Sequence, residues 1–236
     1  MIKGVQTLKY SSVKVARFIR RPNRFIAHVI VDNNEEIVHV KNTGRCREIL
    51  QEGTMVILEE AKNTERKTKY SLIASYKGDV LINIDSQVPN LVVFDGIKEG
   101  KIKELHNVTK LSKEVVYGNS RFDLYFETKD QSGFIEVKGV TLETEGIAMF
   151  PDAPTQRGCK HIYEMIKAVQ EGYGGFIFFL IQMTGVNYFT PFEIRDPEFT
   201  KALRLASEKG VTILAYDSIV SEDGITIGTP VEVRLC

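Results

Sequence analysis

Three residues of this 236-residue chain have the types and the spacing for chemistry: Asp123, Glu136 and Lys138. They lie in two runs rich in β-prone residues, 120–127 and 134–142, which a polar turn separates. Because alternate side chains of a strand point the same way, Glu136 and Lys138 are expected on one face. Neighbouring strands lie about 4.8 Å apart, so pairing of the two runs would bring Asp123 close to Glu136.

A pair of carboxylates with room for water suits Mg²⁺ or Mn²⁺, which prefer oxygen ligands. Asp123 and Glu136 are the predicted ligands. The carbonyl of Val137 and the upstream acid Glu114 are candidate helpers. Beside such an ion, Lys138 could stabilise a phosphoryl transition state or help to deprotonate the attacking water. The ordinary alternative is a cross-strand charge pair, which is what Glu-x-Lys on a solvent-facing strand usually forms.

The first run also predicts which side chains accompany the acid. Phe122, Leu124 and Phe126 are expected to share one face of the strand. Asp123 and Arg121 then share the opposite face. Arg121 is therefore a candidate phosphate ligand, although it could instead only neutralise the acids.

A helix is expected to begin at Thr155 and to end at Gly172, because apolar residues recur at helical spacing between them. The positive end of a helix dipole attracts phosphate. Four polar residues occupy the first turns and are the candidate phosphate ligands: Gln156, Arg157, Lys160 and His161. For His161, a packing or hydrogen-bonding role is the alternative.

Charge is distributed unevenly along a chain whose formal net charge is zero. Residues 1–84 hold 15 Lys and Arg against 9 Asp and Glu, whereas the remainder holds 16 against 22. This asymmetry favours contact between the first part and a polyanion. The residues expected to follow a DNA backbone are Arg20, Arg24, Lys41, Asn42, Arg45, Arg66 and Lys67. Phe18 and Phe25 beside them are expected to be core residues.

Composition is that of an ordinary globular protein, with 43% hydrophobic and 26% charged residues. No apolar run approaches the roughly 20 residues of a membrane span, and the start lacks the apolar stretch of a secretory signal. The three cysteines, Cys46, Cys159 and Cys236, have no metal-binding spacing and suggest reduced thiols. We therefore expect a cytoplasmic protein without a membrane partner. Its oligomeric state stays open, with a homodimer as one option.

The order of predicted elements indicates a mixed α/β protein with two domains. Residues 1–84 read as short strands with one helical candidate, 45–50, which predicts an OB-like β-barrel. Residues 85–236 read as α-β-β-β-α-β followed by α-β, with helices over 89–97 and 197–209 and a last strand over 211–216. This order, with an acid on the second strand and Glu-x-Lys on the third, resembles the core of the PD-(D/E)xK nuclease superfamily.

A closer resemblance emerges when the phrases are taken together. Those that carry it are Arg24-Phe25, His39 with Asn42-Thr43-Gly44, Arg66-Lys67, Tyr117-Gly118, Ser120-Arg121-Phe122-Asp123, Glu136-Val137-Lys138, Val140-Thr141-Leu142 and the run 150–161, FPDAPTQRGCKH. In this order they resemble the sugar fermentation stimulation protein A (SfsA) family nearly from end to end. The resemblance implies DNA binding of low sequence specificity and a regulatory link to sugar (maltose) metabolism. Gly139 and Cys46 differ from the residues expected in these phrases, but neither change removes a predicted ligand.

Two functions follow from these patterns. The first is a DNA-binding protein with a metal-dependent phosphodiesterase centre, that is, a deoxyribonuclease. The second is a DNA-binding regulator that uses the nuclease-like domain as a scaffold. A pure binder has no need for acids facing a polyanion, which favours the first. An enzyme acting on a small phosphorylated sugar ranks last.

Overall fold

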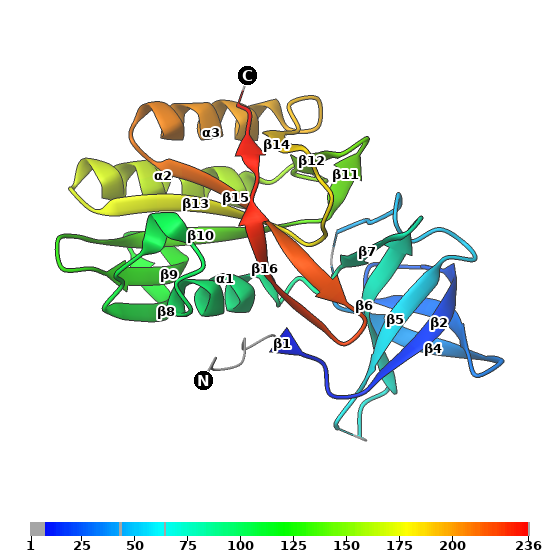
Figure 1. Cartoon of the computed structure of the whole chain (residues 1–236). Helices are drawn as coiled ribbons and strands as arrows, with labels where there is room; N and C mark the ends of the chain where they lie inside the picture. The colour runs from blue at the N-terminus through cyan, green and yellow to red at the C-terminus, as the bar shows by residue number, and fades with distance from the viewer. Residues whose placement is uncertain (1–7, 43, 64, 236) are drawn as a thin grey trace.

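The structure is a computed structural model that describes residues 8–42, 44–63 and 65–235. Figure 1 shows two bodies side by side, a small β-barrel built from the first third of the chain and a larger layered α/β body. Both were predicted, and the order of elements in the larger body, α-β-β-β-α-β, is confirmed.

The barrel is closed by pairing between strands β4 and β6. Strand β3 alternates buried and half-buried residues, as expected for a sheet with one face on a core, whereas β6 is buried over its first six residues. Asp32 and Asn33 turn the chain between two of them with positive φ, a conformation that these residue types tolerate. The strands of this sheet are β2 (Val13–Arg20), β3 (Ile26–Val31), β4 (Asn34–Val40), β5 (Met55–Glu60), β6 (Tyr70–Lys77) and β7 (Val80–Asn83).

The helix predicted over 45–50 is wrong. The chain there makes a single turn, in which the N–H groups of Ile49 and Leu50 both donate to the carbonyl of Cys46. Cys46 has a positive φ of 46° and is buried. Burial of these three side chains in the barrel core therefore determines the backbone path, and six residues are too few for a helix to resist it.

The larger body is built on a seven-stranded sheet in the order β1-β16-β15-β13-β10-β9-β8. The three central strands run parallel and the outer ones antiparallel. The central strand is apolar throughout, as predicted for a strand covered on both faces. The strands are β1 (Leu8–Lys9), β8 (Lys110–Tyr117), β9 (Ser120–Glu127), β10 (Ser132–Val140), β13 (Gly174–Ile181), β15 (Thr212–Ser221) and β16 (Gly224–Pro230).

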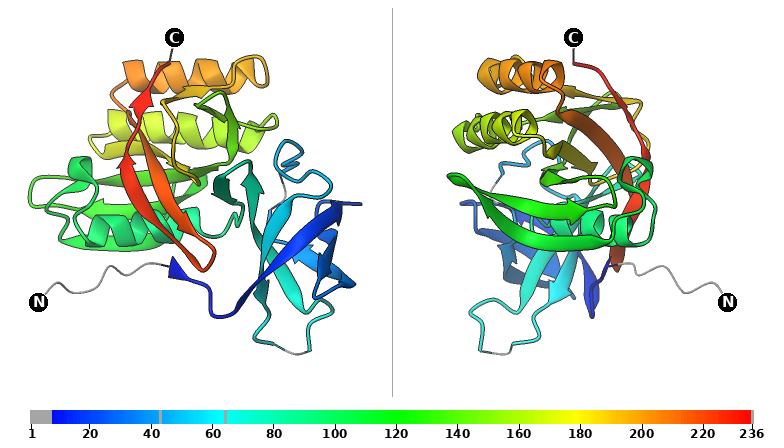
Figure 2. Two further views of the ribbon diagram at one scale, coloured as in Figure 1. Left: turned by 45° about the vertical axis from the view of Figure 1, so that its right-hand side comes forward. Right: turned by 90° about the vertical axis from the view of Figure 1, so that its left-hand side faces the viewer.

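Helices cover both faces of this sheet (Figure 2). Helix α1 (Pro89–Lys98) packs on one face, and α2 (Gln156–Gln170) and α3 (Pro197–Glu208) pack on the other. Thr155 and Asp196 begin the latter two helices, because their side-chain oxygens accept from backbone N–H groups three residues on. A short 3₁₀ turn, η1 (Lys103–Leu105), follows α1.

A second, smaller sheet of four short strands was not predicted. It is formed by β11 (Leu142–Thr144), β12 (Ile147–Phe150), β14 (Tyr188–Pro191) and β17 (Glu232–Val233). The prediction that 211–216 is the last strand is also wrong, since two strands follow it. The strands of the small sheet, β17 included, have two to four residues, too few for alternation to be read from a sequence. This reason does not apply to β16, which has seven residues.

A buried polar network joins the two bodies. Asn83 in the barrel donates to the hydroxyl of Tyr10 (2.9 Å), and Gln182 in the larger body donates to Asn83 (3.0 Å). Lys41 pairs with Asp85 at 3.1 Å in the same network. In addition, β1 lies within residues 1–84 but pairs with β16 of the larger body. A domain division between 84 and 85 stays a prediction.

Gly133 allows β10 to approach β13 closely, and β10 carries Glu136 and Lys138. A Cβ at this position would lie 2.1 Å from the carbonyl oxygen of Gly174, a contact that only a backbone shift can relieve. We expect Gly133→Ala to destabilise the protein by about 1–3 kcal/mol, which lowers the melting temperature by about 2–12 °C. Thermal unfolding measures this, with Lys129→Ala in the adjacent exposed turn as the control. An unchanged melting temperature for Gly133→Ala would contradict it.

Candidate active site

Asp123 lies where strands β9 and β10 part. The pairing of the two strands ends with Leu124 opposite Ile135. The next two residues, Asp123 and Glu136, are not paired. Instead of a backbone carbonyl of β9, the Asp123 carboxylate accepts a hydrogen bond from the backbone N–H of Val137, at 2.8 Å. Its other oxygen accepts from the side-chain amide of Asn90 at 2.8 Å. Asn90 is on α1 and was not predicted to belong to the site.

Glu136 is 2% exposed and lies on the opposite side of β10 from the apolar pair Ile135 and Val137. One of its oxygens, Oε1, accepts from both Lys138 Nζ and His161 Nδ1. The other, Oε2, is buried without a hydrogen-bond partner among the described residues. A buried carboxylate oxygen without a partner is costly, so this atom is a candidate to bind a ligand.

The charges of these residues act on one another. Burial, and then the negative charge of Glu136, raise the pKa of Asp123 above its usual range. Burial also acts to raise the pKa of Glu136, but the hydrogen bond from His161 and the charge of Lys138 outweigh it and lower that pKa. Glu136 is thus held ionised by a cation and an imidazole, while Asp123 has no cation paired to it within the described residues.

The donor set fits a divalent ion that needs few protein ligands. The described residues contain no group of three His, Cys, Asp or Glu side chains arranged to hold a metal. Mg²⁺ is commonly held by one or two carboxylates and keeps several waters. Asp123 and Glu136 supply two such groups, and Glu136 Oε2 has no hydrogen-bond partner among the described residues. Val137 contributes its N–H to Asp123, whereas a role for its carbonyl stays a prediction.

Glu114 and Arg121 lie near this point in the sheet but contact each other. Glu114 interrupts the pairing of β8 and β9 with a positive φ of 55°. Its exposed carboxylate lies 3.5 Å from Arg121.

Phe122 also departs from prediction. It packs against Phe134 and the ring of His161 on the face of the sheet that α2 covers, whereas Leu124 lies on the face that α1 covers. The strand therefore twists at Asp123, and simple alternation fails there.

The first turns of α2 bring one predicted residue directly into the site. His161 reaches Glu136, whereas the exposed Lys160 donates to the carbonyl of Asn119 at 2.8 Å. Gln156 and Arg157 are exposed one turn earlier and stay candidates for phosphate contact.

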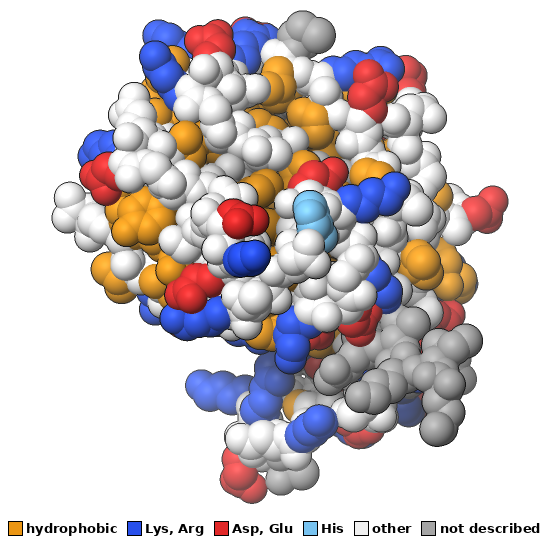
Figure 3. All heavy atoms as spheres, turned by 60° about the vertical axis from the view of Figure 1, so that its left-hand side comes forward, with side chains coloured by type: hydrophobic (Ala, Val, Ile, Leu, Met, Phe, Trp, Pro, Cys, Tyr) orange, Lys and Arg blue, Asp and Glu red, His pale blue; other side chains and the backbone are white. Residues whose placement is uncertain are grey.

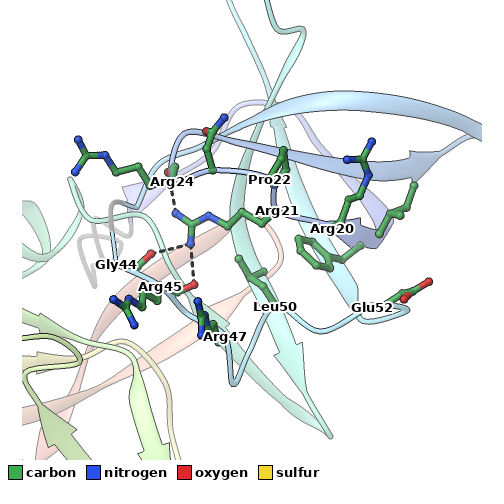
Figure 4. A pocket seen from close by; sticks show the side chains of 12 residues that line it. Arg20, Arg21, Pro22, Arg24, Gly44, Arg45, Arg47, Leu50 and Glu52 are labelled. Carbon is green, nitrogen blue, oxygen red and sulfur yellow. Dashed lines mark hydrogen bonds between the residues drawn. The ribbon is translucent and has the colours of Figure 1, made fainter. Parts of the chain in front are cut away.

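A second hollow, which we call the arginine pocket, lies on the barrel and has a volume of about 460 Å³. Arg21 organises it by donating to the carbonyls of Gly44 (2.7 Å) and Arg24 (2.8 Å). Figure 4 shows the Arg21 side chain reaching these carbonyls while Arg20 and Arg24 extend outward on either side. The exposed guanidinium groups around it belong to Arg20, Arg24, Arg45 and Arg47. Arg21 is not among the residues predicted to follow the DNA backbone.

The other residues predicted to contact the DNA backbone do not line this pocket. Lys41 pairs with Glu59 at 2.7 Å in the polar network between the bodies, and its side chain is 18% exposed. Asn42 uses its side chain to hold its own loop, donating to Ile84 and accepting from Gly44. Arg66 and Lys67 line a different groove, which also contains the acids Glu35, Glu36 and Glu60.

The rings beside the arginines behave differently from each other. Phe18 is a core residue, as predicted, at 3% exposed. Phe25 is 50% exposed, so its assignment to the core is wrong. The guanidinium of Arg24 lies 4.9 Å from the centre of the Phe25 ring. A ring held in this way offers a flat surface to a base.

Figure 3 shows one face of the molecule, on which Lys and Arg side chains gather where the large and small bodies meet. Elsewhere on that face both signs of charge are interspersed. Of the helices in the described residues, none has the length and apolar character needed to cross a membrane.

Comparison with known proteins gives matches along nearly the whole chain. Residues 87–224 match the family model described as "Sugar fermentation stimulation protein RE domain", and residues 19–84 match "SfsA N-terminal OB domain". The second match agrees with the barrel predicted as OB-like.

Two relatives described as sugar fermentation stimulation protein homologs come from Alkaliphilus oremlandii and Clostridium botulinum. The first is 55% identical over 231 residues, covering 96% of this chain and 98% of the relative. The second is 52% identical over 221 residues, covering 93% and 96%. The solved structure of Pyrococcus furiosus SfsA in complex with Ca²⁺ has a TM-score of 0.88 and 27% identity, covering 98% of this chain and all of that one.

Proposed function

The chain belongs to the sugar fermentation stimulation protein family, and from that premise we propose that it is a metal-dependent phosphodiesterase that cuts DNA with low sequence specificity. The observation that carries the proposal is Glu136 Oε2, a buried carboxylate oxygen without a partner beside Lys138 and Asp123. The similar P. furiosus protein was solved with Ca²⁺, an ion with the same preference for oxygen ligands.

Asp123 and Glu136 would hold the ion, Mg²⁺ or Mn²⁺, and Asn90 and Val137 fix the orientation of the aspartate. The ion would supply positive charge against the phosphate and lower the pKa of a nearby water. Lys138 is an ammonium group paired with Glu136, so it can stabilise the charge that develops on the phosphoryl oxygens. His161 holds Glu136 from the other side and acts as a positioning residue.

The arginine pocket would bind the DNA backbone. It offers exposed guanidinium groups with no salt-bridge partner in the described part of the chain, whereas Arg66 and Lys67 share their groove with three glutamates. Contacts of this type ignore sequence and weaken as salt displaces the protein from phosphate. Gln156 and Arg157 at the start of α2 would contact phosphate closer to the carboxylates.

Affinity for DNA should fall steeply with salt, and the arginine pocket should account for part of the dependence. We expect Arg24→Gln with Arg45→Gln to reduce the slope of log affinity against log salt by about 1–2, since each phosphate contact contributes about 0.7–0.9. Fluorescence anisotropy with labelled DNA in Ca²⁺ measures the slope. Arg66→Gln with Lys67→Gln is the matched control and should leave it unchanged. Affinity independent of salt in the wild type would reject backbone binding.

Cleavage of end-labelled DNA in Mg²⁺, Mn²⁺ or EDTA tests the enzymatic proposal. Products are expected with Mg²⁺ or Mn²⁺ and none with EDTA. Single- and double-stranded substrates, linear and circular, would show which strand form is cut and whether cutting starts at ends. Binding without cleavage under every metal condition would reject the nuclease.

That outcome would support the second candidate, a DNA-binding regulator that uses the nuclease-like body as a scaffold. One observation favours it: both oxygens of Asp123 already accept hydrogen bonds from the protein. The unpartnered oxygen of Glu136 weighs against it, because a scaffold has no use for a buried carboxylate with a free acceptor.

A further inference from the structure

A third hollow lies where the two bodies meet, next to the arginine pocket. We call it the junction pocket; its volume is about 190 Å³, smaller than the roughly 300–1,000 Å³ of sites for drug-sized ligands. Both bodies of the molecule contribute to its wall. The residues that line it include Gly44, Pro89, Gly139, Phe150, Asp152 and Gln182.

Its position connects the two regions that would bind phosphate. Gly44 lines both the junction pocket and the arginine pocket. Gly139 directly follows Lys138 in the chain, although a Cβ there would point to Pro89 on the opposite face of β10. Pro89 directly precedes Asn90, which donates to Asp123. A strand bound by the arginines and cut at the carboxylates would therefore pass this hollow.

The pocket contains an acidic side chain, Asp152, although a surface that binds nucleic acid usually carries basic side chains. Asp152 has no hydrogen bond or salt bridge with any described residue. Its carboxylate is packed against the backbone of Gly44, where a Cβ would come within 2.6 Å of Oδ2. A carboxylate without a partner among the described residues repels phosphate, so an anionic group is disfavoured here and a neutral group that enters should bring N–H or O–H donors.

Two donors in the wall are already used, because Ser86 donates to the carbonyl of Lys41 and Asn42 donates to that of Ile84, while Thr141 adds a further hydroxyl. The amide nitrogen of Gln182 is used by Asn83 and the carbonyl of Asp85, which leaves its oxygen packed against Gly139. Pro89 and Phe150 supply apolar surface. The acceptor oxygens of Asp152 and Gln182, with apolar surface beside them, suit a flat heterocycle that has N–H groups along one edge.

We propose that the junction pocket takes up one unpaired nucleobase, with a preference for guanine, beside the phosphate to be cut. Guanine has two N–H donors, N1–H and the 2-amino group, side by side on its Watson–Crick edge, and a carboxylate can accept both. This inference rests on the proposed function and adds to it that the substrate is single-stranded, or frayed at the cut. A base pair does not fit a hollow of this size, and a paired base has no free Watson–Crick edge.

The test compares Asp152→Asn with Asp130→Asn, the same substitution on an exposed residue of the β9–β10 turn. Binding is measured by NMR line broadening of dGMP, dIMP and dTMP, and of single-stranded oligothymidylate with or without one central guanine. Wild type and Asp130→Asn should bind dGMP, and the guanine-containing strand, about tenfold or more tightly than the dIMP and all-thymine counterparts. Asp152→Asn should lose this preference while retaining the wild-type melting temperature. Equal binding of dGMP and dIMP, or a preference unaffected by Asp152→Asn, would overturn the proposal.

Two further arms separate this proposal from the nuclease. Binding of mononucleotides needs no cleavage, so a preference for guanine without any cut strand would retain the base pocket and reject the phosphodiesterase. Cleavage of single strands that does not depend on guanine would support the phosphodiesterase and reject the base pocket. Broadening of maltose or glucose signals that Asp152→Asn abolishes, with no effect of dGMP, would show that the pocket holds a neutral sugar and would overturn the proposal.

Discussion

Lys138→Ala is expected to reduce metal-dependent DNA cleavage by about 10²–10³-fold while leaving DNA affinity in Ca²⁺ nearly unchanged. The reason is its position: Nζ contacts Glu136 Oε1, so the ammonium lies beside the carboxylates, away from the arginine pocket. A preorganised positive group aimed at developing charge contributes this much to many enzymes. Single-turnover rates on labelled DNA measure the loss.

Two variants separate the possible origins of that loss. Lys129→Ala removes a lysine from the exposed turn at the other end of the same hairpin and should cleave like the wild type. Lys138→Arg retains the charge but cannot give up its proton, so substantial activity in it indicates electrostatic stabilisation and no activity indicates proton transfer. Melting temperatures are needed beside the rates, because removing one partner of a buried ion pair destabilises. Equal cleavage by wild type and Lys138→Ala would mean that the activity comes from a contaminant.

The central part of the site could be predicted because strand geometry is regular. Alternation along β10 predicts that Glu136 and Lys138 share a face, and their ion pair agrees with this. Helical spacing predicts the start of α2 within one residue, which is enough to bring His161 to the same carboxylate. In each case a short-range rule fixes where the side chain points.

The rest depends on contacts distant in sequence. Asn90 reaches Asp123 only because α1 packs across β9 and β10, and no local pattern distinguishes this asparagine from an exposed one. Lys41 was read as a surface cation, but it is paired with acids at positions 59 and 85. Glu114 stays a prediction: its positive φ interrupts the strand, and its carboxylate lies beside Arg121.

The same limit applies to the barrel. The alternation along β3 and β4 predicts strands of a barrel, because the side chains of a single strand are enough to show which of its faces is buried. The arginine pocket arises from Arg21 bonding to carbonyls more than 20 residues along the chain, which no periodicity reveals. A basic run therefore predicts polyanion binding in general, while the fold decides which of its members remain exposed.

The metal site itself is tested most directly by heating the protein with and without the ion. Mn²⁺ at 100 times its dissociation constant would stabilise the wild type by about 2.7 kcal/mol, which raises the melting temperature of a chain of this size by about 5–11 °C. Glu136→Gln should abolish that rise, because it replaces the carboxylate whose Oε2 has no partner in the protein. Removing the ion with EDTA should return the wild type to its metal-free melting temperature.

Glu114→Gln is the matched control, since it makes the same substitution on an exposed acid paired with Arg121. It should retain the full rise in melting temperature with Mn²⁺. A rise that survives in Glu136→Gln and disappears in Glu114→Gln would move the ion to the edge of the sheet, away from Lys138, and the role proposed for that lysine would then have no physical basis. Loss of the rise in Glu136→Gln alone would place the ion beside the ammonium, which is the arrangement that phosphodiester cleavage requires.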